Sequence, residues 1–81
     1  MQEKLDDQIY VTIEFSKQGP RPQKFIWKNK EYDIKNINFV HKSKEGDALL
    51  THFSVSGKID SYKITFNSKD LSWKLNEIYF T

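Results

Sequence analysis

The chain has no cysteine among its 81 residues. Disulfide-stapled folds, thiolate metal sites and cysteine nucleophiles are therefore excluded. Alanine is almost absent, occurring once, whereas isoleucine occurs eight times. Because β-branched residues favour strands and alanine favours helices, this balance predicts a protein built mainly of β-strands.

Long apolar runs are also missing, and none approaches the ~20 residues that a membrane-spanning helix requires. The first eight residues, MQEKLDDQ, are acidic and polar, which is the reverse of a secretory signal. We therefore expect a cytoplasmic protein with no membrane contact.

Glycine occurs only three times, and no glycine-rich phosphate loop can be drawn. His41 and His52 are the two histidines. The functional interpretations are a metal ion bracketed with Asp47 or a histidine acting as a general base, but the stronger interpretation is two exposed histidines on neighbouring strands of a hairpin. We therefore predict no catalytic, cofactor-binding or metal-binding residue, and a protein that is not an enzyme.

Apolar residues alternate with polar ones along much of the chain, as in Ile9, Val11, Ile13 and Phe15. About six such segments recur at intervals of roughly 8–12 residues. The prediction is an all-β single domain, residues 1–81, of five or six strongly bent antiparallel strands forming a small barrel or coiled meander. Residues 1–8 are expected to be a disordered or helical tail, SKQGPRP a break, and HKSKEGDA a loop.

The parity of the apolar positions changes twice. Tyr32 and Ile34 stand on even positions but Ile37 and Phe39 on odd ones, and Trp73 and Leu75 are followed by Ile78 and Phe80. A flat strand cannot bury both sets on one face. We therefore predict a bulge or sharp bend near residues 35–36 and another near residues 76–77.

Positive charge is concentrated in the middle third of the chain. Residues 17–44 contain eight basic and two acidic side chains, although the whole chain carries only +2. Mixtures of basic and aromatic residues bind single-stranded nucleic acid, through phosphate contacts and base stacking. The residues proposed for such a surface are Arg21, Lys24, Lys28, Lys30 and Lys35, with Tyr10 and Tyr79 as outward-facing rings.

The same segment has a plainer interpretation. Phe25, Trp27 and Tyr32 follow strand alternation and are expected to fill the core, with the lysines on a solvated face. A further alternative is a protein-interaction module without a nucleic-acid role. It would pair with a partner or with itself as a homo-oligomer through an exposed edge strand, at residues 9–15 or 77–80. All these interpretations describe a non-enzymatic binding module.

The order of aromatic residues resembles that of small bacterial β-proteins of unknown function. Their pattern is Pro-x-x-Phe-x-Trp, then Tyr-x-Ile, with a closing Tyr-x-Ile and Trp-x-Leu. The resemblance covers roughly residues 20–78 and implies a compact antiparallel sheet or small barrel, without assigning any catalytic residue. The matching positions are Pro22, Phe25, Trp27, Tyr32, Ile34, Tyr62, Ile64, Trp73 and Leu75.

Overall fold

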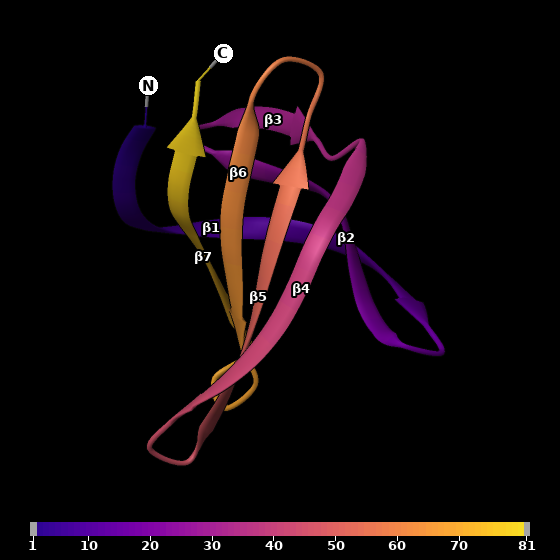
Figure 1. Cartoon of the computed structure of the whole chain (residues 1–81), viewed down its shortest axis with the longest axis vertical. Coiled ribbons are helices and arrows are strands. Elements are labelled where there is room, and N and C mark those ends of the chain that lie inside the picture. Colours follow the sequence, from indigo (N-terminus) through magenta and orange to yellow (C-terminus); the bar gives the residue numbers. More distant parts are fainter. Residues whose placement is uncertain (1, 81) are drawn as a thin grey trace.

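The computed structural model describes residues 2–80 and shows one antiparallel sheet of seven strands (Figure 1). The strands follow the order β3-β2-β1-β7-β6-β5-β4 across the sheet. Their bounds are β1 (Gln2–Ser16), β2 (Gly19–Trp27), β3 (Lys30–Asp33), β4 (Asn36–Glu45), β5 (Ala48–Ser56), β6 (Ser61–Asn67) and β7 (Ser72–Tyr79). No helix in residues 2–80 is long and apolar enough to cross a membrane.

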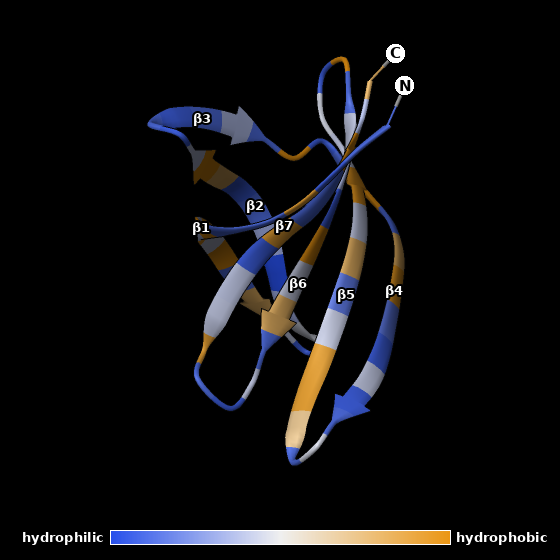
Figure 2. Cartoon of the chain, turned by 90° about the vertical axis from the view of Figure 1, so that its left-hand side faces the viewer, coloured by the Kyte–Doolittle hydropathy of each residue, from blue (hydrophilic) through white to orange (hydrophobic). Residues whose placement is uncertain are grey.

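Alternation along the strands separates an inner face, which carries the core, from an outer face. On β5, Phe53 and Val55 are buried, whereas the intervening Ser54 lies on the other side. Figure 2 shows the same alternation of apolar and polar residues along β5 and β6. The buried core cluster contains Ile9, Phe25, Phe53, Val55, Tyr62, Ile64, Trp73, Leu75 and Ile78. The nine residues that carry the resemblance to small bacterial β-proteins all lie on this inner side. Eight of them belong to the core cluster or pack against it, and the ninth, Pro22, has a fully buried side chain.

The long first strand bends the sheet onto itself. Residues 2–9 of β1 pair with β7, whereas residues 10–16 pair with β2. The register shifts between Lys4 and Asp7 on one side and between Thr12 and Ile13 on the other. Such irregularities bend a strand and increase its twist. In consequence β1 and β2 cross behind the strands β4–β7, and the core fills the space between (Figure 1).

The two expected irregularities are both present. In the β6–β7 ladder, Lys63 pairs with Glu77 and Ile64 with Leu75, which leaves Asn76 as the extra residue of a bulge. Near residue 35 the chain leaves β3, where it is bonded to β2, and enters β4, where it is bonded to β5. There Ile34 N donates to Gln23 O at 2.9 Å, and Lys35 N donates to Ser56 O at 2.8 Å. This link explains the change of parity between Ile34 and Ile37.

The strand bounds correct two expectations, for the amino-terminal segment and for the segment HKSKEGDA. Residues 2–8 are neither disordered nor helical, because they pair with β7 and Leu5 packs against the core; Met1 lies outside the described residues. The segment HKSKEGDA is largely strand, since β4 continues to Glu45 and only Gly46 and Asp47 make the turn. Gly46 has a φ of +62°, which suits a tight turn.

Pro20 and Pro22 lie within a strand instead of breaking the chain. Residues 19–22 of β2 pair with β1 alone, and the register shift leaves Gln23 without a counterpart on β1. Proline is tolerated at sheet edges and bulges, where no ladder donor is needed. The sheet therefore has seven strands, more than the five or six expected, and it does not close, because β3 and β4 are its two free edges.

Candidate functional site

The five basic residues proposed for nucleic-acid binding occupy three places. Arg21 and Lys24 belong to β2. Their neighbours Pro22 and Phe25 are buried on the inner face, so Arg21 and Lys24 point to the outer face. Lys28 and Lys30 are at the turn between β2 and β3, and Lys35 is in the link from β3 to β4. The fold therefore brings Arg21 near Lys24 and Lys28 near Lys30, but it does not place the five on one strand.

Acidic residues accompany the basic ones on the outer face of β1–β2–β3. Lys24 Nζ lies 3.5 Å from Glu31 Oε1, and Lys24 stands opposite Asp33 in the ladder. Arg21 likewise stands opposite Glu14. Exposed ion pairs of this kind contribute little to stability, but they offset the local positive potential.

The two turn lysines lie over aromatic rings. Lys28 Nζ is 4.8 Å from the centre of the Trp27 ring, and Lys30 Nζ is 5.9 Å from that of Tyr32. These distances are within the range of cation–π attraction. Lys28 and Asn29 both have positive φ, at 52° and 62°, as a tight two-residue hairpin turn requires.

Tyr10 on β1 and Tyr79 on β7 lie far apart in the sheet. Tyr10 is 73% exposed and stands opposite Ile26, which is 42% exposed. Tyr79 stands opposite Gln2, at the far end of the β1–β7 ladder. The Tyr79 hydroxyl donates to the Glu77 carboxylate, and this hydrogen bond, with some desolvation, raises the pKa of Tyr79. Tyr10 thus forms an apolar pair with Ile26 but no joint patch with Tyr79.

One of the two expected interaction edges is not an edge. Residues 77–79 belong to β7, which pairs with β1 on one side and with β6 on the other. Residues 10–15 of β1 pair with β2 alone, because β7 runs beside residues 2–9 only. The two outermost strands of the sheet are β3, with four residues, and β4, with ten.

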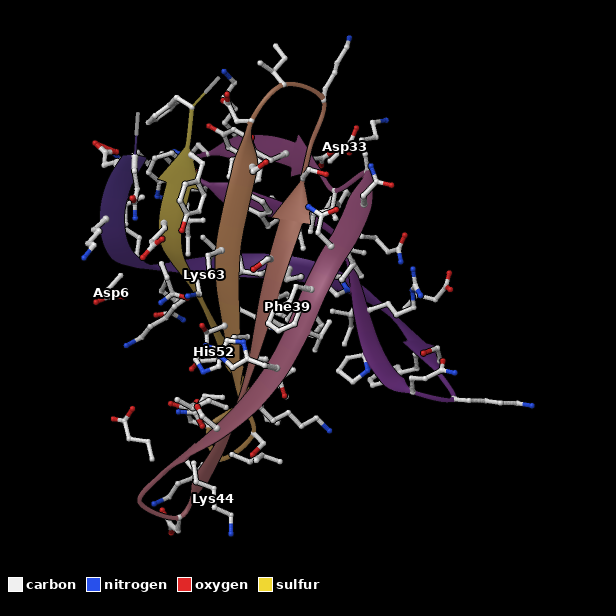
Figure 3. The ribbon with its side chains drawn as sticks, in the orientation of Figure 1. Asp6, Asp33, Phe39, Lys44, His52 and Lys63 are labelled. Carbon is white, nitrogen blue, oxygen red and sulfur yellow. The ribbon has the colours of Figure 1, made fainter. Side chains whose placement is uncertain are left out.

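Strand β4 is therefore the long free edge of the sheet. Within residues 2–80 it pairs with β5 alone, so one side of its backbone meets no other strand of the chain. Phe39 is 60% exposed on the outer face, on the same side as His52 (Figure 3), and Val40 is 44% exposed on the inner face. The sequence signal for this edge is the pair of lysines at 42 and 44, since lysine is common on edge strands.

A hollow of about 420 Å³ opens on the inner side of β4, between the β4–β5 pair and the β1–β2 hairpin. One wall is largely apolar, with Val40 and Phe53, and the opposite wall carries Pro20 and Arg21. Its lining residues are Ser16, Gln18, Gly19, Pro20, Arg21, Ile37, Val40, Thr51 and Phe53.

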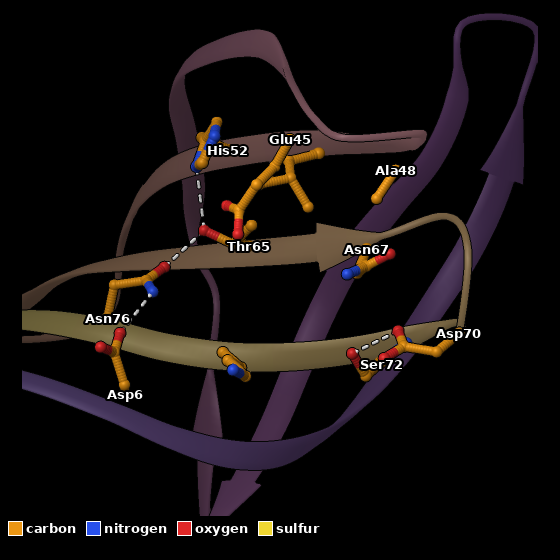
Figure 4. A pocket seen from close by; sticks show the side chains of 11 residues that line it. Asp6, Glu45, Ala48, His52, Thr65, Asn67, Asp70, Ser72 and Asn76 are labelled. Carbon is orange, nitrogen blue, oxygen red and sulfur yellow. Dashed lines mark hydrogen bonds between the residues drawn. The ribbon is translucent and has the colours of Figure 1, made fainter.

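A second hollow, of about 410 Å³, lies on the outer face and is polar (Figure 4). A chain of hydrogen bonds crosses it from β5 to β1. His52 Nδ1 lies 3.0 Å from Thr65 Oγ1, the Thr65 hydroxyl donates to Asn76 Oδ1, and Asn76 Nδ2 donates to Asp6 Oδ1 at 3.1 Å. The bulge at Asn76 turns that side chain toward the outer face.

The two histidines are direct cross-strand neighbours. The rings of His41 and His52 stack with centroids 4.5 Å apart, and His52 Nε2 lies 2.8 Å from Ser43 Oγ. Burial, then the neighbouring His41 and Lys63, lower the pKa of His52. His41 lies in the middle of β4, although the sequence placed it at a strand end. Asp47 is not with them, because its carboxylate pairs with Lys69 Nζ at 2.8 Å.

Neither a protein-family model nor a curated protein nor a solved structure matches this chain.

Proposed function

We propose that this protein is a non-enzymatic binding module whose partner adds an extended strand to the free edge of β4. The observation that carries this proposal is the ten-residue length of β4 with pairing on one side only. An exposed strand edge offers a row of backbone donors and acceptors that a second extended segment can satisfy. The exposed Phe39 and Val40 add apolar contacts on both faces of that edge.

The charges beside the edge indicate the chemistry of the partner. Lys42 shares the inner face of β4 with Val40. Lys44 follows two residues later on the same face. A partner strand whose inward-facing side chains, at every second position, are apolar opposite Val40 and acidic opposite Lys42 and Lys44 would match this face.

A second copy of the chain fits this edge less well. Lysines on an edge strand repel another lysine-bearing edge, which is one way that sheets avoid pairing with themselves. The register shift between Ile37 and Phe39 also interrupts a symmetric ladder. A different, acidic strand avoids the first difficulty. Added at β4, it would extend the open sheet toward the small barrel that the sequence predicts.

The test uses a fluorescein-labelled synthetic peptide as long as β4, 10 residues, in which every second residue is Thr and the remaining positions carry Val and Glu in the order that sets Val opposite Val40 and Glu opposite Lys42 and Lys44 (the Val–Glu peptide; Lys replaces Glu in the Val–Lys peptide). Fluorescence anisotropy measures its binding to the full chain. We expect saturable binding that Val40→Glu weakens at least about tenfold, or about 1.4 kcal/mol. Ile26→Glu is the matched control, because Ile26 is 42% exposed and Val40 44%.

Three results would overturn the proposal. They are no binding of the Val–Glu peptide, equal binding of a Val–Lys peptide, and equal weakening by the two variants. Light scattering of the protein alone tests whether a second copy occupies the β4 edge. A dimer that Val40→Glu dissociates would show that the partner is a second copy and not an acidic strand.

Single-stranded nucleic acid is the second candidate partner. It is favoured by Tyr10, whose ring is 73% exposed beside Ile26 on the outer face that also carries Arg21 and Lys24. Binding of a labelled mixed oligonucleotide should then fall steeply as salt rises, because phosphate contacts release counterions. The double change Lys28→Glu with Lys30→Glu should weaken it, and Val40→Glu should not. Binding that is insensitive to salt would exclude this candidate.

A further inference from the structure

The histidine pair brings two metal-ligating side chains together on the outer face. His41 and His52 are paired residues of the β4–β5 ladder, and both rings lie on the outer face. The Cβ atoms of such a pair are about 4.5–5.5 Å apart. A nitrogen of each ring can therefore reach one ion at the usual distance of about 2.0–2.1 Å for zinc.

The hydrogen-bond chain orients His52 for this task. The Thr65 hydroxyl donates its proton to Asn76, so Thr65 Oγ1 is left to accept from Nδ1–H of His52. This network assigns the proton to Nδ1 and the lone pair to Nε2, which accepts from the Ser43 hydroxyl. Ligating histidines generally donate their second N–H to such an acceptor, which fixes the ring and its tautomer.

Charged groups of both signs surround the pair. The groups that face the pair are Ser43 from β4, Lys63 and Thr65 from β6, and the carboxylates of Glu45 and Asp6 along the adjoining hollow. Lys63 opposes a cation, whereas the two carboxylates favour it.

We propose that His41 and His52 bind a divalent transition-metal ion of the class that prefers imidazole, with zinc as the representative ion. Nε2 of His52 and one nitrogen of His41 are the protein ligands. Within residues 2–80 no group of three or more histidine, aspartate or glutamate side chains is placed to hold a metal, so water molecules complete the coordination. Magnesium and calcium prefer oxygen ligands and are excluded.

Two small movements complete the site. The Ser43 hydroxyl leaves Nε2 of His52, and the His41 ring turns out of the stack so that its nitrogen also points at the ion. His41 is exposed, and no hydrogen bond of its ring to the described residues opposes that turn. The bound ion would link the edge strand β4 to β5 on the outer face.

The test is calorimetric titration of the full chain with zinc chloride near neutral pH. We expect one saturable site, occupied below about 1 mM, that His41→Gln and His52→Gln each weaken at least about tenfold. Thr65→Val, which removes the positioning hydroxyl, should weaken binding less than either. The control is Asp47→Asn, because Asp47 contacts Lys69 and not the histidines.

A second readout is the melting temperature, which zinc should raise in the native chain and not in His41→Gln. Both histidine variants are expected to fold, since neither ring belongs to the core cluster. The proposal is overturned by unsaturable heats, by equal binding in His41→Gln and the native chain, or by equal binding of magnesium.

Discussion

Trp27 Nε1 donates a hydrogen bond to Asp7 Oδ2 at 2.8 Å, joining the end of β2 to the bend of β1. Asp7 lies where the β1–β7 register shifts, and Trp27 is the last residue of β2. The bond therefore ties the β2–β3 hairpin to the part of the sheet that holds the core.

Removing the acceptor should destabilise the fold. Asp7→Ala leaves the partly buried indole N–H without its charged partner, and we expect a loss of about 1.5–3 kcal/mol in the free energy of unfolding. Asp7→Asn retains an acceptor and should lose less. Urea denaturation followed by tryptophan fluorescence measures both, and equal losses in the two variants would show that the hydrogen bond is unimportant.

Shortening a fully buried side chain should have a predictable effect. Ile64 has no exposed surface, so Ile64→Val should reduce the free energy of unfolding by about 0.5–1.5 kcal/mol. The same change at Ile26, which is 42% exposed, should have an effect within about 0.5 kcal/mol of zero. Chemical denaturation of the pair makes the comparison, and a larger loss at Ile26 would contradict the assigned inner and outer faces.

Leu71 offers a stabilising substitution. It lies in the turn between β6 and β7 with a φ of 59°, and its side chain is 71% exposed. The left-handed conformation costs an ordinary residue about 1–2 kcal/mol, and glycine avoids that cost. Leu71→Gly should therefore raise the melting temperature, whereas Leu71→Val should lower it. A lower melting temperature for the glycine variant would mean that the leucine side chain makes contacts that outweigh the strain.

Stability should fall on mild acidification because of His52. Its pKa in the folded state is lowered by burial first, and next by His41 and Lys63, from the ordinary value of 6.5. As the pH falls through 6.5, the unfolded chain takes up a proton before folded His52 does. The free energy of unfolding therefore decreases over that interval, and it levels off once folded His52 is also protonated.

The measurement is urea denaturation at about pH 7.5 and about pH 5.5. His52→Gln removes this titration and should lose less stability between the two pH values than the native chain does. An equal loss in both proteins would assign the acid sensitivity to other groups.

Local patterns were sufficient for most of the inner face and for two irregularities of the strands. Phe15 and Phe39 are exceptions, because alternation grouped them with inner-face residues and they are 79% and 60% exposed. Alternation alone placed Phe25, Ile64 and Leu75 on the inner side, because successive side chains of a strand point to opposite faces. The change of parity at Asn76 is a bulge for the same reason, since an extra residue is needed to return Ile78 to the core. The exposed ring of Tyr10 also followed from alternation.

The candidate sites depended on pairings between distant residues, and these were predicted poorly. His41 was placed at a strand end beside a loop, yet it stacks on His52 within a continuous ladder. The basic residues were treated as one surface, although the bends at both ends of β3 distribute them over three places.

The sequence by itself determined the strand-forming character of this chain, most side chains of its core and the two irregularities near residues 35 and 76. These properties depend on the period of two along a strand and on the turn residues, which are local. Only the tertiary structure decided that β7 is internal, that β4 is the long free edge, that β1 is irregular near residues 5 and 12, and that His41 meets His52. Those outcomes depend on which strands pair across the whole chain, and the polar first eight residues gave no local sign that they would insert beside β7.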